Sequence, residues 1–294
     1  MAHYLSMPDA YPPHLTSLLA DFLASTPPKD AEKAIVKLIA GSSESSDEFD
    51  PEGSWAQAIL GAHCRRPHRR NVVDDGFFSE MAIEARLLSL LELPEIQPVN
   101  PGIIPNRAIP FSKLDHAKPG DVGVFHEKDP MFADYLVYRE VREEAWSKVS
   151  LLASTDCSLY TDMPFCLQIA NTYMNRLTAH DLQRAERLHA PLCRWGDWRS
   201  YEPYITRTPL AFIGLPKNSA LWVGSYGVSK KREDKRNFKK GLEAMLDWLR
   251  PVRVFVYGPM PRDVFGDYEG TTDFVCYPNW TKMRHKEASR GKLD

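Results

Sequence analysis

Apolar and polar positions in the second half of the chain follow the pattern of an α/β protein. Short apolar runs typical of buried strands lie at residues 122–125, 150–154, 192–195, 210–213, 221–225 and 252–257. Between them, apolar side chains recur at helical spacing over residues 131–148, 163–190 and 233–249. Strands separated by helices imply crossover connections and a mostly parallel sheet. About six strands fit either an open sheet or an incomplete or distorted (βα) barrel.

The first half of the chain has helical spacing but no strand pattern. Apolar residues recur every three or four positions over residues 14–24, 30–39 and 79–93, while serine and acidic residues dominate residues 42–54. Residues 94–120 hold six prolines and little periodicity. The predicted parts are a helical N-terminal appendage (1–93) with a mobile acidic loop (42–54), a proline-rich linker or arm (94–120), an α/β core (121–260) and an irregular basic C-terminal tail (261–294).

The composition is that of a folded chain with reduced cysteines. At 294 residues, 43% of them hydrophobic and 26% charged, the chain is long enough to bury a full core. No run reaches the roughly 18 to 20 apolar residues that span a bilayer, and no signal-peptide pattern is present, so we expect a cytoplasmic protein without a membrane partner. Five scattered cysteines without a C-x-x-C pair disfavour a disulfide framework and a thiolate zinc site.

Polar residues gather where the predicted strands end. Asp156 and Ser158 follow the strand at 150–154, and Asp162 is placed to cap the next helix, with Pro164 in its first turn. In a parallel sheet the carboxyl ends of the strands meet at one edge, where α/β proteins hold their ligands. The residues expected at this edge are His126, Asp156, Ser158, Asp162, Asp197, Arg199, Ser225 and Tyr257.

Two carboxylates at this edge, Asp156 and Asp197, form the candidate catalytic pair. Carboxylates on neighbouring strands can act as acid and base, or one can act as a nucleophile. The structural alternative is that either acid accepts backbone N–H bonds in a turn. Ser158 is a third candidate, although it lacks the G-x-S-x-G elbow of serine hydrolases. The candidate ligand-binding residues of the same edge are His126, Arg199 and Tyr257.

The net charge of −2 gives no overall attraction to nucleic acid, so any contact with it must come from local basic clusters. Two such clusters are candidate contacts for phosphate. The first lies in residues 63–70 and fits either a phosphate-contacting loop or a solvated loop that offsets the acidic stretch before it. The second, residues 230–240, follows a glycine-containing turn without the full P-loop pattern and fits a solvated helix face equally well. The candidate residues are Arg65, Arg66, Arg69 and Arg70 for nucleic acid, and Lys230, Lys231 and Arg232 for phosphate.

Several motifs in residues 100–260 resemble those of a bacterial and phage family known as domain of unknown function 4417. They are Thr-Asp-Cys-Ser-Leu-Tyr-Thr-Asp-Met-Pro at 155–164, Asn171 with Tyr173, Asn175 and Arg176, Trp195-Gly196-Asp197, the run from Gly224 to Val228, and Val256-Tyr257-Gly258. Family members generally have an aromatic residue where this chain has Cys157, whereas both acids and the serine remain. The resemblance implies a phage or mobile-element protein without an assigned activity.

Two functional hypotheses remain open. The first is an enzyme that acts on a nucleotide, or on a base in nucleic acid, through the carboxylates at the strand ends. The second is a non-catalytic binding protein directed at a host factor, of the counter-defence or host-takeover type. A deep pocket with converging acids favours the enzyme, and a shallow rim with a large apolar patch elsewhere favours the binding protein. The sequence does not identify a cofactor.

Overall fold

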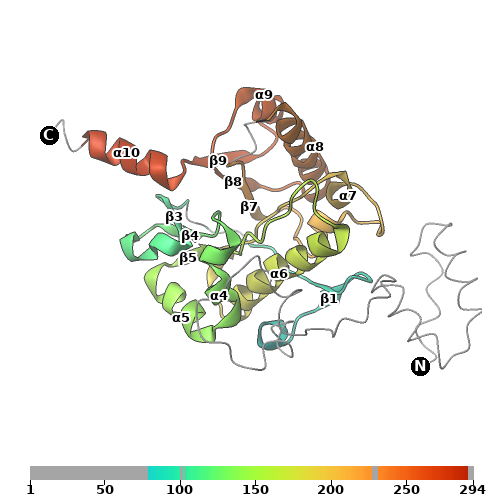
Figure 1. The fold of residues 1–294 in the computed structure, drawn as a ribbon, viewed down its shortest axis with the longest axis horizontal. Coiled ribbons are helices and arrows are strands. Elements are labelled where there is room, and N and C mark those ends of the chain that lie inside the picture. Colours follow the sequence, from blue (N-terminus) through green and yellow to red (C-terminus); the bar gives the residue numbers. More distant parts are fainter. Residues whose placement is uncertain (1–78, 100–101, 103, 227–230, 291–294) are drawn as a thin grey trace, which may run out of the picture.

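Seven parallel strands in two sheets form the centre of the fold in the computed structural model, which describes residues 79–99, 102, 104–226 and 231–290 (Figure 1). The first sheet contains, in spatial order, β3 (Ala108–Pro110), β4 (Val122–Val124), β5 (Leu151–Ala153) and β6 (Leu188–Ala190). The second contains β7 (Ala220–Gly224), β8 (Arg253–Tyr257) and β9 (Asp273–Tyr277). All neighbouring strands within these two sheets are parallel, which confirms the predicted α/β class and mostly parallel pairing.

The two sheets share one layer of buried side chains. Alternate residues of the strands point to this layer, because side chains in a strand alternate between the two faces. Its members are Ala108, Val122, Val124, Leu151, Ala153, Ala190, Leu192, Ala220, Trp222, Phe255, Tyr257 and Tyr277. A parallel bridge between Leu192 and Trp222 joins the sheets on one side, and the Tyr277 hydroxyl donates to the Pro105 carbonyl on the other. The described strands do not close into a barrel.

Helices cover the outer faces of both sheets, as the ribbon shows (Figure 1). On the first sheet they are α4 (Ala133–Val137), α5 (Arg139–Lys148) and α6 (Phe165–Arg184), and on the second α8 (Arg232–Leu249) and α9 (Arg262–Phe265). The remaining helices are α7 (Trp198–Tyr201), α10 (Trp280–Arg290) and the 3₁₀ helices η1 (Ser79–Ala82), η2 (Phe111–His116), η3 (Asp129–Met131), η4 (Leu210–Phe212) and η5 (Gly266–Tyr268). No helix in the described ranges is long and apolar enough to cross a membrane.

Helix α8 shows how the sequence specifies these outer helices. Phe238, Leu242 and Met245 recur at helical spacing and pack on the second sheet. Two acids in the first turn favour the positive end of the helix dipole. The helix ends at Arg250, whose left-handed backbone and N–H bond to the Leu246 carbonyl close the last turn. The prediction of this helix is therefore confirmed.

The helix predicted over residues 79–93 is wrong. Only η1 is helical there, and the chain continues as an antiparallel hairpin of β1 (Leu87–Leu88) and β2 (Leu93–Pro94). Glu84, Ser89 and Glu92 have positive φ, which an α-helix does not tolerate. The leucine-rich spacing fits a hairpin with Leu93 buried against α6 as well as it fits a helix.

Other boundaries also differ from the predictions. The proposed linker 94–120 contributes β3 to the first sheet, and the C-terminal segment 261–294, expected to be irregular, contributes β9 to the second. The helix expected over 163–190 ends earlier, because Glu186 adopts φ 54 and β6 follows. The runs at 192–195 and 210–213 form an isolated bridge and η4 instead of strands. The helices expected before residue 40, and the acidic loop at 42–54, lie outside the described residues.

Candidate functional site

The polar site lies at the carboxyl edge of the parallel strands. His126 follows β4, Asp156 follows β5, Arg194 follows β6, and Tyr257 is the last residue of β8. Parallel strands bring these ends to the same edge, so residues far apart in sequence become neighbours. The predicted grouping of His126 with Asp156 and Tyr257 is thus present in the structure, with Arg194 as an additional member.

Asp156 is a buried carboxylate with two basic neighbours. Its Oδ1 accepts from Nη1 of Arg194 at 2.6 Å, and its Oδ2 lies 2.7 Å from Nδ1 of His126. Burial alone raises the pKa of this carboxyl, but the charge of Arg194 and the contacts of His126 outweigh burial and lower the pKa below its ordinary value. Asp156 is therefore held as a carboxylate.

His126 is fixed between Asp156 and an aromatic ring. Its imidazole stacks on Tyr257 with ring centroids 5.0 Å apart and an interplanar angle of 13°. Gly224 at the end of β7 makes this position possible, because a Cβ there would lie 2.7 Å from His126 Nδ1. The Nε2 atom of His126 is buried and has no hydrogen-bond partner within the described ranges. The ring therefore retains one unused polar atom.

Helix α6 clamps the loop that carries Asp156. The Thr155 N–H donates to Thr178 Oγ1 at 3.1 Å, and the Cys157 N–H donates to Asn175 Oδ1 at 2.7 Å. Asn171 donates from Nδ2 to the Ser158 carbonyl at 2.6 Å. These contacts explain the buried polar residues of α6, which satisfy backbone groups of a loop that has no strand partner.

Ser158 pairs with a second acid, Asp129 in η3. The Ser158 hydroxyl donates to Asp129 Oδ1 at 2.7 Å, and its N–H donates to Oδ2 at 3.1 Å. Burial raises the pKa of Asp129, and the negative charge of Asp156 raises it further, although the bonds from Ser158 oppose the shift. The two carboxyls Asp129 and Asp156 therefore have pKa values shifted in opposite directions, an arrangement typical of acid–base pairs.

A cavity of about 300 Å³ opens beside this cluster, a size within the range of small-molecule sites. Arg194 and Gly224 lie on its wall, which places the ion pair of Asp156 directly behind the cavity. Aromatic residues contribute much of the remaining wall, and α8 contributes polar side chains. The lining includes Tyr160, Arg194, Trp195, Gly224, Tyr226 and Asp234.

Asp197 has a different environment from Asp156. Its Oδ1 accepts from the Arg199 N–H at 3.0 Å as the N-cap of α7, and its Oδ2 accepts from Arg199 Nη2 at 2.7 Å and from Gln168 Nε2 at 3.1 Å. Burial raises the pKa of this carboxyl, but the bonds from Arg199 lower it below the ordinary value. No hydrogen bond or ion pair among the described residues joins Asp197 to Asp156.

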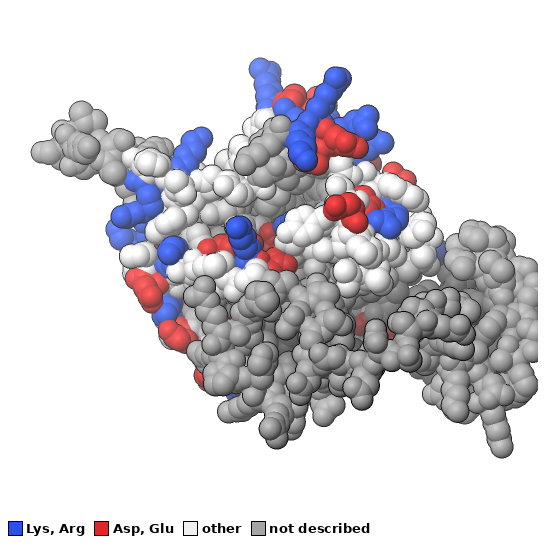
Figure 2. Space-filling view, viewed as in Figure 1, with Lys and Arg blue, Asp and Glu red and all other residues white. Residues whose placement is uncertain are grey.

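The other predicted site residues are dispersed. Asp162 is exposed and does not cap α6, whose N-cap is Pro164. Ser225 is buried and donates to the Pro259 carbonyl at 2.6 Å. Lys231 and Arg232 are exposed at the start of α8, where Figure 2 shows Lys and Arg mixed with Asp and Glu. The predictions that fall on Lys230, Arg65, Arg66, Arg69 and Arg70 lie outside the described residues.

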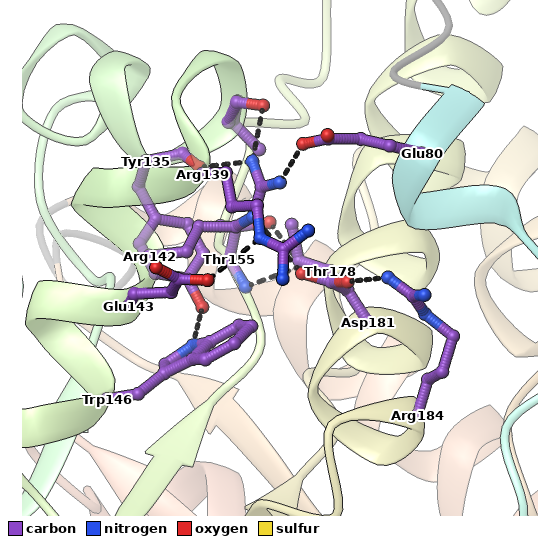
Figure 3. Close-up of polar contacts among 11 residues, drawn as sticks. Glu80, Tyr135, Arg139, Arg142, Glu143, Trp146, Thr155, Thr178, Asp181 and Arg184 are labelled. Carbon is purple, nitrogen blue, oxygen red and sulfur yellow. Dashed lines mark hydrogen bonds and ion pairs between the residues drawn. The ribbon is translucent and has the colours of Figure 1, made fainter.

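Two buried arginines of the described chain serve the fold. Arg176 in α6 donates to the carbonyls of Ile213, Leu192 and Ala211 at 2.8, 3.0 and 2.5 Å, and burial lowers its pKa to about 10. Arg142 in α5 pairs with the buried Asp181 of α6 at 3.2 Å and also contacts Glu80 (Figure 3). Figure 3 shows that this second network ties η1, α5 and α6 together.

Sequence reasoning missed Arg194, Asp129 and Asp234. Arg194 lies in a short connection without strand pairing, although it directly precedes the Trp195-Gly196-Asp197 motif. Asp129 is the first residue of η3 and precedes Pro130. An acid at the start of a helix is usually interpreted as stabilising the helix dipole. The proximity of Arg194 and Asp129 to Asp156 depends on the crossovers, which no local pattern encodes.

Residues 85–278 match the family described as "Domain of unknown function (DUF4417)", and the chain belongs to this family. The relatives include two proteins named "Gene 1 protein". The one from Mycobacterium phage L5 is 24% identical over 206 residues, which are 69% of this chain and 86% of the relative. The one from Mycobacterium phage D29 is 23% identical over 141 residues, which are 48% of each chain. No solved structure matches the chain significantly.

Proposed function

We propose that this protein is an enzyme that acts on a nucleotide, or on a base in nucleic acid, at the cavity beside Asp156. The observation that carries the proposal is the Arg194–Asp156–His126 cluster, in which Arg194 lines a cavity with aromatic surroundings and the other two residues lie behind it. Aromatic side chains stack on nucleobases, and an arginine supplies donors to base or phosphate oxygens.

The cluster divides the chemical roles among its members. Asp156 is the carboxylate and Asp129 the carboxyl that retains its proton to higher pH, so together they can supply a base or nucleophile and an acid. Arg194 holds the ligand and keeps Asp156 ionised. Ser158 orients Asp129 through its hydroxyl, a positioning role.

Thermal stabilisation by ligand tests this proposal. A ligand at about 100 times its Kd stabilises the native state by about 2.7 kcal/mol, which a melting curve resolves. We expect nucleoside monophosphates to raise the Tm of the parent and of Asp247→Asn, a charge removal on the exposed side of α8. Arg194→Lys should lose most of this response. An unchanged response in Arg194→Lys excludes the cavity as the binding site.

Turnover distinguishes the enzyme from the alternative, a non-catalytic binding protein directed at a host factor. One observation favours the alternative: both oxygens of Asp156 already have partners, so the carboxylate must exchange one of them to react. Chromatography of nucleotide and oligonucleotide substrates after incubation should show a released base or a modified base. Asp156→Asn should abolish that product. If ligands bind without any product, the binding protein is the better account.

Further expectations depend on the same proposal. A nucleic-acid substrate should contact basic residues on the exposed side of α8, so its binding should weaken steeply with salt. Replacement of Lys231 and Arg232 by glutamine should reduce that salt dependence. We place the protein in the cytoplasm of a host cell, and we interpret the seven strands as a distorted barrel-like core.

A further inference from the structure

Two exposed tyrosines lie at the cavity. Tyr160, in the loop between β5 and α6, is 56% exposed, and Tyr226, after β7, is 60% exposed. None of the ring contacts among the described residues involves either of them. Half-exposed aromatic rings without an aromatic neighbour, placed beside a cavity, suit a planar ligand. The walls therefore favour a stacked ring.

The same cavity has a cation with unused donors. Arg194 donates from Nη1 to Asp156, whereas its buried Nε has no hydrogen-bond partner among the described residues. The Arg194 side chain is 28% exposed and lies on the wall of the cavity. An arginine donates only, which means that the matching edge of a ligand must carry acceptors.

The cavity also has a carboxylate with unused acceptors. Asp234, in the first turn of α8, lines the cavity and has no hydrogen bond or ion pair within the described ranges. No ion pair joins Asp234 to Arg194, so each remains available to a ligand. A carboxylate only accepts, and the edge that it binds must carry N–H donors.

We infer that the cavity selects guanine over adenine and cytosine, with Arg194 and Asp234 as the residues that determine specificity. Guanine carries the acceptors O6 and N7 on one edge and the donors N1–H and N2–H₂ on another, which matches a donor-only and an acceptor-only residue. Adenine has a donor beside N7, and cytosine has a donor at N4, so each opposes Arg194. The inference rests on the proposed function, because it names the base that the cavity takes.

Asp234 also stabilises α8, and the experiment must separate this role from base recognition. An acid in the first helical turn stabilises the helix dipole, and loss of that effect lowers Tm without changing selectivity. Inosine monophosphate isolates the recognition role, because it lacks the N2 amino group of guanosine monophosphate and is otherwise the same. Asp247→Asn is the matched control, since it removes the same charge from an exposed position of α8.

The experiment is a calorimetric titration of the full chain with guanosine, inosine, adenosine and cytidine 5′-monophosphates. We expect guanosine monophosphate to bind at least about tenfold more tightly than the other three. Asp234→Asn should reduce the preference over inosine monophosphate to about twofold or less, while Asp247→Asn keeps it. Tyr160→Ala and Tyr226→Ala should weaken all four ligands by a similar factor, because stacking does not depend on the base edge.

Two outcomes overturn the inference in different ways. If adenosine or cytidine monophosphate binds as tightly as guanosine monophosphate, or if Asp234→Asn keeps the preference over inosine, the guanine assignment is wrong. The proposed nucleotide site survives that result. If none of the four ligands binds the parent protein, both the guanine assignment and the proposed function fail.

Discussion

Replacement of Asp156 by asparagine tests the ionic character of the strand-end cluster. The amide keeps the size of the side chain and one acceptor oxygen, but it carries no charge. Arg194 then keeps at most a neutral hydrogen bond in place of its 2.6 Å ion pair, and His126 loses the anion 2.7 Å from Nδ1. The expected result is a folded but less stable protein, because a partly buried cation is left without a counter-ion.

The structure sets the size of this effect. Breaking a fully buried ion pair costs about 3 to 5 kcal/mol, but the Arg194 side chain is 28% exposed and water can solvate part of its charge. We therefore expect Asp156→Asn to lower the free energy of unfolding by about 2 to 3 kcal/mol. For a chain of this size, that corresponds to a decrease in Tm of about 4 to 12 °C.

The pH dependence of the difference identifies its cause. The pKa of Asp156 is lowered in the folded state, so the stabilisation is fully present above the unfolded pKa of about 3.9 and is lost as pH falls through the folded pKa. Calorimetric melting of parent and variant between pH 7 and pH 3 should show a constant difference in Tm that narrows as the pH falls below about 4. A variant that melts within about 1 °C of the parent at pH 7 would refute the ion-pair account.

Three further variants probe neighbouring parts of the structure. Asp197→Ala should lower the free energy of unfolding by about 1 to 2 kcal/mol, because it removes the N-cap of α7 and the partner of Arg199. The stabilisation by nucleotide should remain. Loss of that response would place Asp197 in the site. Arg176→Met should lower the free energy of unfolding by more than about 3 kcal/mol in a denaturant titration, because the carbonyls of Ile213 and Leu192 lose this donor and that of Ala211 keeps only the weak Cys193 thiol. A smaller loss would mean that water replaces the guanidinium. Gly224→Ala should lower the free energy of unfolding by about 1 to 3 kcal/mol and weaken nucleotide binding, because its Cβ would lie 2.7 Å from His126 Nδ1. Normal binding would show that nucleotide binding does not depend on the position of the imidazole.

The predicted elements that the structure confirms are those with unambiguous apolar patterns. The runs that became β4, β5, β7 and β8 are continuous and flanked by helices, and α8 has a clear apolar face. The failures have local causes. Ala108-Ile109-Pro110 is short and lies in a proline-rich stretch, and β9 (Asp273–Tyr277) buries only Tyr277 fully, so neither strand has a strong pattern. Both are strands because tertiary pairing overrides weak local preference.

The candidate site was partly predictable for a similar reason. A parallel sheet brings the ends of its strands to one edge, which is sufficient to expect His126, Asp156 and Tyr257 together. The same argument also predicted that Asp197 faces Asp156, but Asp197 is bound instead to Arg199 and Gln168. Side-chain bonds, such as that from Arg194 to Asp156, decide which acid of a loop turns toward the site. Such bonds depend on packing, which the spacing of residues in the sequence does not determine.

A crystal structure with guanosine monophosphate bound would test the central claim most directly. The account predicts density for the base in the cavity, stacked against Tyr160 or Tyr226 and within about 3.2 Å of a donor nitrogen of Arg194. The Asp156–Arg194 pair should remain on the wall beside it. Density for the nucleotide against Lys231 and Arg232 at the start of α8, with the cavity empty at saturating ligand, would contradict the claim.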